Sequence, residues 1–78
     1  MTVRRNEQGT IVLQGHCRVD DTETLFQLLQ ATPAGPVDWR ECTGLHTAIV
    51  QLLLAARPHF TGPCGDPLVT RLFLLNSL

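Results

Sequence analysis

A chain of 78 residues is long enough for one small core, so residues 1–78 are expected to form a single domain. Hydrophobic residues make up 44% of the chain and charged residues 17%, which is too apolar for a disordered protein. The formal net charge is −1, and the six basic residues are scattered arginines, so the sequence lacks the positive cluster that nucleic-acid binding requires.

The N-terminal part of the chain predicts a β-hairpin. Residues 2–5 and the β-branched, apolar residues 10–14 are the two expected strands. The turn between them contains Gly9, which can adopt a positive φ. Gly15 is expected to end the second strand.

A helix is predicted next, beginning near Asp20. Asp20 and Glu23 have the three-residue spacing of a capping pair, and acidic residues suit the positive end of a helix dipole. The expected apolar face consists of Leu25, Leu28 and Leu29, with Phe26 beside it. The segment Pro33–Pro36 should end this helix.

The second half of the chain alternates strands with helices. The expected order is a strand at residues 36–40, a turn at 41–44, a helix at 45–56, a loop at 59–67 with a residual strand near Phe60, and a helix at 67–75. Asp66 is the predicted N-cap of the last helix, whose expected apolar face is Leu68, Leu72 and Leu75. Such alternation indicates an α/β fold, a small mixed sheet of three to four strands with helices packed on one face.

Composition and cysteine usage indicate the compartment and the need for a partner. Three widely spaced cysteines are a poor disulfide framework, and no apolar stretch is long enough to span a membrane. We therefore expect a cytoplasmic protein with reduced thiols, no membrane insertion and no cofactor. The apolar content exceeds the need of so small a core, which points to a protein partner or a homodimer.

Three segments together resemble the STAS domain, the family of sulfate transporter and anti-sigma factor antagonist domains. Residues 37–45 are similar to its central strand and Asp-Ser-Ser/Thr-Gly-Leu turn, residues 11–20 to its strand-Gly-x-x-Asp entry to the first helix, and residues 66–73 to its Pro-x-Val-x-Arg-Leu-Leu helix. The resemblance covers nearly the whole chain in the family's order. Glu41 stands in place of the family's Asp, and Cys42 in place of the first Ser.

This resemblance implies a non-catalytic protein-interaction domain with STAS-like architecture. Its implied partner is a histidine-kinase-like serine kinase acting as an anti-sigma factor, or a subunit of a transporter complex. Cys42 cannot take the phosphate that switches the family, whereas Thr43 still carries a hydroxyl and is the phosphorylation candidate. A plain N-cap role for Thr43 is the alternative.

The predicted docking surface runs from the turn at 41–44 along the following helix. Its residues are Asp20, Glu41, Cys42, Thr43, His46, Thr47, Val50 and Leu54. The part of this stripe on the helix could equally pack beneath a neighbouring helix. Trp39, the sole Trp, is expected in the core.

A thiol or metal enzyme is the remaining hypothesis. Cys42 at a helix start would have a lowered thiol pKa, and His46 lies four residues further on. However, no orienting group or oxyanion element is identifiable, and no Cys-x-x-Cys or His-x-x-x-His pair exists. We therefore predict no catalytic residues and no metal ligands, and expect the cysteines to be buried as small hydrophobes.

Overall fold

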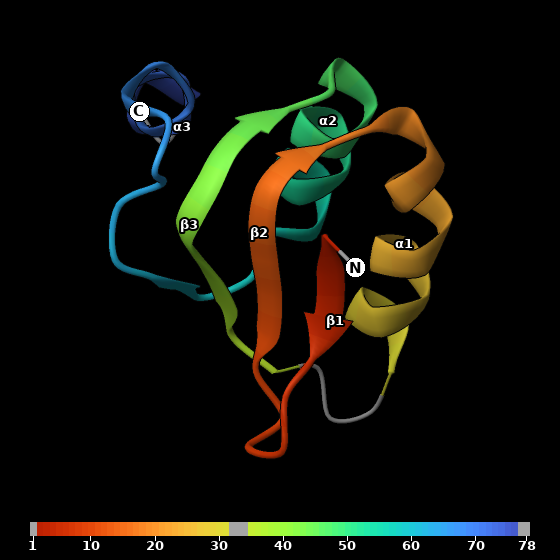
Figure 1. The fold of residues 1–78 in the computed structure, drawn as a ribbon. Helices are drawn as coiled ribbons and strands as arrows, with labels where there is room; N and C mark the ends of the chain where they lie inside the picture. The colour runs from red at the N-terminus through yellow and green to blue at the C-terminus, as the bar shows by residue number, and fades with distance from the viewer. Residues whose placement is uncertain (1, 32–34, 77–78) are drawn as a thin grey trace.

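The computed structural model describes residues 2–31 and 35–76. Within these residues, one four-stranded mixed sheet is accompanied by three α-helices, which confirms the predicted α/β class. The elements are β1 (Val3–Arg5), β2 (Ile11–Cys17), a short 3-10 helix η1 (Val19–Asp21), α1 (Thr22–Gln30), β3 (Val37–Leu45), α2 (Thr47–Ala56), β4 (Phe60–Thr61) and α3 (Pro67–Asn76). The strand order is β1-β2-β3-β4, with β1 antiparallel to β2 and the other neighbours parallel (Figure 1).

The N-terminal hairpin forms as predicted, but its second strand is longer than expected. Val3 pairs with Leu13 in the antiparallel register, and Gly9 in the turn has a φ of 82°. β2 continues beyond Gly15 to Cys17, so the expected end at Gly15 is wrong. Instead, the register between β2 and β3 shifts between Gly15 and His16. Gly15 has a φ of 70°, a backbone conformation that glycine adopts without a Cβ clash.

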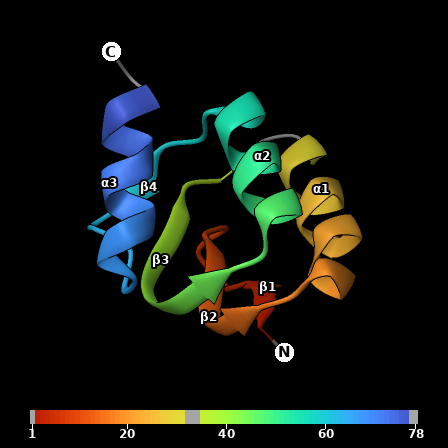
Figure 2. The same cartoon turned by 90° about the horizontal axis from the view of Figure 1, so that it is seen from above.

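Helices α1 and α2 cover one face of the sheet, while α3 lies along the β3–β4 side (Figure 2). The predicted α1 face is confirmed, because Leu25 is fully buried and Phe26 is exposed. Pro33 and Ala34, in the segment expected to end this helix, lie outside the described residues; α1 ends at Gln30. One cluster forms the core: Val3, Ile11, Leu13, Cys17, Leu25, Val37, Trp39, Cys42, Ile49, Leu53, Cys64 and Val69.

The face of α3 that meets this core is not the predicted one. Its expected apolar residues are exposed: Leu68 by 62%, Leu72 by 40% and Leu75 by 65%. Val69 is buried instead, and Phe73 packs against the core. The helix start is as predicted, since Leu68 N donates to Asp66 Oδ1 over 3.0 Å.

Trp39 explains why α3 turns this face inward. The indole is buried, as predicted, and stacks on Phe60 with ring centroids 3.9 Å apart. The Phe73 ring meets the indole edge-on, with ring centroids 5.0 Å apart. The indole Nε1 of Trp39 donates to Gly62 O over 2.7 Å. This aromatic contact links β3, β4 and α3, and it selects the Val69–Phe73 face of the helix.

The boundary between β3 and α2 also differs from the prediction. Residues 41–44, expected to form a turn, are part of β3, and α2 begins at Thr47 and not at Leu45. Cys42 is fully buried whereas Glu41 and Thr43 are exposed, the alternation of a strand with one covered face. In the described ranges, no helix is long and apolar enough to cross a membrane.

Candidate functional site

The candidate site lies at the carboxyl ends of β2 and β3. These strands are parallel, so η1 after β2 and α2 after β3 begin at the same edge of the sheet (Figure 1). His46 N donates to Cys17 O over 2.9 Å and ties the two exits together. Ligands and partners of open α/β sheets commonly bind at this edge.

Thr43 is exposed, but it is not a helix cap. It lies within β3, and the N-cap of α2 is His46, whose Nδ1 accepts a hydrogen bond from Ala48 N at 3.1 Å. The N-cap alternative for Thr43 is therefore wrong. Thr47, the first residue of α2, is also exposed. The N–H groups that follow it, those of Ala48, Ile49 and Val50, all donate to His46, either to its Nδ1 or to its carbonyl oxygen.

Cys42 is fully buried, so its predicted place in the docking surface is wrong. Its thiol donates to Gly44 O over 3.3 Å. A hydrogen bond with Cys17, together with burial, raises the pKa of the Cys42 thiol well above its usual range. The prediction of a lowered pKa is wrong, because Cys42 lies inside a strand and not at a helix start.

The three cysteines are buried, as expected, but sequence reasoning did not bring them together. Cys17, Cys42 and Cys64 belong to one core cluster, and Cys64 Sγ contacts Cys42 O at 3.9 Å. Burial raises the pKa of the Cys64 thiol to about 11. Among the described residues, no group of three His, Cys, Asp or Glu side chains is arranged to hold a metal ion.

Other predicted site residues lie on the surface at this end of the molecule or beside it. Asp20 in η1, His46 and Thr47 are exposed near the exits of β2 and β3. Glu41 is exposed on β3, where its Oε2 accepts a 2.7 Å hydrogen bond from Gln14 Nε2.

Two residues of the predicted stripe lie further along α2. Val50 and Leu54 are half-buried. Neither belongs to the buried cluster or to the partly buried residues packed against it. The described structure therefore gives them no place in the core.

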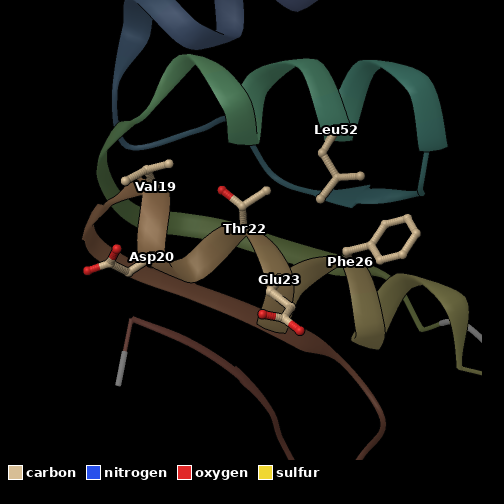
Figure 3. A pocket seen from close by; sticks show the side chains of 6 residues that line it. All are labelled: Val19, Asp20, Thr22, Glu23, Phe26 and Leu52. Atoms are coloured by element: carbon tan, nitrogen blue, oxygen red, sulfur yellow. The ribbon is translucent and has the colours of Figure 1, made fainter.

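A groove between the first two helices was missed by the sequence interpretation. The groove is open to solvent and has a volume of about 540 Å³. Figure 3 shows its lining residues, which come from η1, α1 and α2: Val19, Asp20, Thr22, Glu23, Phe26 and Leu52. Phe26, noted in the sequence as lying beside the apolar stripe, was the available signal. A large side chain off the core-facing stripe of an amphipathic helix is a candidate surface contact.

Comparison of the chain with protein-family models, with curated proteins and with solved structures gave no match.

Proposed function

We propose that this chain is a non-catalytic, cytoplasmic protein-interaction domain of the STAS type. It docks through residues 41–54 onto a protein partner, a histidine-kinase-like serine kinase acting as an anti-sigma factor. Phosphorylation of Thr43 controls the docking. The partner class and the switch follow from the STAS resemblance of residues 37–45.

The observation that carries the proposal is the exposed surface where β3 passes into α2. Thr43, His46 and Thr47 are exposed there, and Val50 and Leu54 continue beside them without joining the core cluster. A patch that mixes polar and apolar side chains is typical of a docking site. The small four-stranded sheet with three helices supports the proposal only at the level of the α/β class.

A phosphate on Thr43 would act mainly by repulsion. Thr43 and Glu41 are two residues apart, and both are exposed on β3. The phosphate adds about −1.5 to −2 charges next to that carboxylate. This added charge opposes docking of an acidic or apolar partner surface.

A second function is favoured by the position of Thr43. Thr43 lies in β3, away from the N–H groups that begin α2, so it lacks the usual stabilisation of a helix-bound phosphate. That observation favours an unregulated structural subunit of a larger assembly, such as a transporter complex.

The test compares matched variants in affinity capture from the native cells, with mass spectrometry of both bait and captured protein. Under the proposal, wild type and Thr43→Ala capture a kinase-like partner, whereas Thr43→Asp does not. Thr47→Arg should weaken capture, while Gln30→Arg, which also introduces an arginine but at the exposed end of α1, should not.

Each alternative has its own signature in that experiment. A phosphate found on Thr43 of the free bait supports the switch. A stoichiometric transporter subunit captured equally by Thr43→Asp and Thr43→Ala supports the structural subunit. If Thr47→Arg and Gln30→Arg capture the same partner equally well, docking through the 41–54 surface is refuted.

A further inference from the structure

The groove between α1 and α2 exposes apolar side chains that the fold itself does not need to expose. Val19 is 52% exposed and Phe26 is 44% exposed, and both line the groove with Leu52 of α2 (Figure 3). Leu52 also packs against the core, so the groove floor is continuous with the interior. Grouped apolar side chains with a polar rim are characteristic of a protein contact.

Thr22 adds a polar group to this floor. Its Oγ1 is buried, and it has no hydrogen-bond partner among the described residues. The side chain points toward α2 between Val19 and Leu52 (Figure 3). A buried hydroxyl without a partner costs free energy, so the junction of η1 and α1 is locally less stable than the rest of the fold.

The rim of the groove is acidic. Asp20 and Glu23 are exposed and line it, and their carboxylates make no hydrogen bond or ion pair with another described residue. The neighbouring Asp21 is already engaged, since its Oδ2 accepts from Arg18 N over 2.9 Å. Residues 18–23 thus carry three carboxylates against the single guanidinium of Arg18, and the local potential favours a cationic partner.

The shape of the groove selects the kind of occupant. Small-molecule sites bury most of their ligand, whereas Val19 and Phe26 stay about half exposed here. An open groove whose lining is half apolar and half polar suits a partner helix that is itself amphipathic and places its apolar side chains into the groove.

We propose that this groove binds an amphipathic helix of a partner protein, with its apolar side chains between Val19, Phe26 and Leu52 and its Lys or Arg side chains opposite Asp20 and Glu23. The inference rests on the proposed function, because it names the chemistry of the partner's docking element. It adds a contact that is separate from the 41–54 surface.

The test uses two synthetic peptides with one leucine pattern, apolar at i, i+3, i+4 and i+7, and with either Lys or Glu on the flanking positions. Fluorescence anisotropy measures their affinity, and backbone amide NMR shifts locate the contact. We expect the Lys peptide to bind at residues 19–26 and to weaken with added salt, and the Glu peptide not to bind.

Matched variants distinguish binding in the groove from non-specific binding to exposed apolar or acidic side chains. Phe26→Ala should weaken the Lys peptide about tenfold, and Asp20→Lys combined with Glu23→Lys by at least as much. Leu68→Ala removes an apolar side chain on α3 that is more exposed than Phe26, and Glu7→Lys reverses a charge in the hairpin turn; neither should change the affinity.

Three results would overturn the groove: no binding of the Lys peptide, equal binding of the Glu peptide, or equal loss with Leu68→Ala and Phe26→Ala. Repeating the groove variants in the capture experiment keeps the two proposals apart. If capture survives Phe26→Ala and the double lysine variant but fails with Thr47→Arg, the partner does not bind in the groove and the proposed function still stands. If the Lys peptide binds at the groove but capture is insensitive to Thr47→Arg, the groove stands and docking through the 41–54 surface is refuted.

Discussion

Gly65→Ala tests how closely the segment before α3 runs over β3. A Cβ at residue 65 would fall onto the carbonyl oxygen of Cys42 and lie 2.8 Å from that of Arg40. Both obstacles are backbone atoms of a central strand, so they cannot move aside as a flexible side chain can. Gly65 N also donates to Trp39 O over 3.1 Å, which ties the segment to β3 at the same place.

The expected destabilisation is about 2–3 kcal/mol, the upper part of the range of about 1–3 kcal/mol found when extra atoms are forced into a packed site. A chain of this length has a total stability of about 4–12 kcal/mol, so the loss is a large share of it. Thermal unfolding followed by circular dichroism should show a Tm lower by about 10–20 °C.

Gly44→Ala is the matched control for this prediction. A Cβ there would lie 2.5 Å from Nδ1 of His16, but that imidazole is exposed and can rotate away. Its effect should stay within about 1 kcal/mol. A Tm for Gly65→Ala equal to that of Gly44→Ala would refute the close packing of residue 65 on β3.

Three further outcomes are expected. Trp39→Phe removes the donor to Gly62 O and should lower the free energy of unfolding in urea by about 1–2 kcal/mol, whereas an unchanged value would mean that the 2.7 Å hydrogen bond contributes nothing. The hydrogen bonds from Arg40 lower the pKa of the Asp38 carboxyl, so its stabilisation is present above the unfolded pKa of about 4 and is lost as pH falls through the lower folded value. The stability difference between wild type and Asp38→Asn should therefore shrink between pH 7 and pH 2, and a constant difference would contradict this. The three buried thiols should react with a disulfide reagent only as fast as the chain opens, and rapid reaction of a folded thiol would show that the core cluster is wrong.

The sequence predicted the fold class well because its periodic segments are long enough to be unambiguous. The strand of residues 10–14, the Leu25 face and the Asp66 cap all depend on neighbours in the chain, and all are present in the structure. The two-residue β4 was expected only as a residual strand near Phe60, and it forms there by pairing with β3.

The boundary between β3 and α2 could not be predicted from local signals. Thr43 and Gly44 are residues typical of turns, yet Cys42 and Gly44 pair with β2 and extend the strand to Leu45. Tertiary pairing outweighs turn propensity here. The consequence for the site is direct, because the predicted phosphate-binding helix start lies at His46 and Thr47 and not at Cys42 and Thr43.

The apolar face of α3 was wrong for a related reason. Leucine spacing alone selects Leu68, Leu72 and Leu75, but the core contact is decided by the fit of Phe73 against Trp39. That fit depends on residues 34 positions apart in the sequence, and no local window contains it. The sequence does show that Phe26 lies beside the apolar face of its helix. It does not show the groove, because the neighbouring Leu52 comes from another helix.

Both edges of the sheet are short. β1 has three residues, two of them the exposed Arg4 and Arg5, and β4 at the other edge has two residues. Unpaired edge strands are the usual template for aggregation and for recognition by strand addition, and short or charged edges block both. Beyond β4, the segment before α3 covers part of β3, where Gly65 N donates to Trp39 O. Strand addition onto β1 or β4 would therefore gain few backbone hydrogen bonds, which favours recognition of this domain through its side chains.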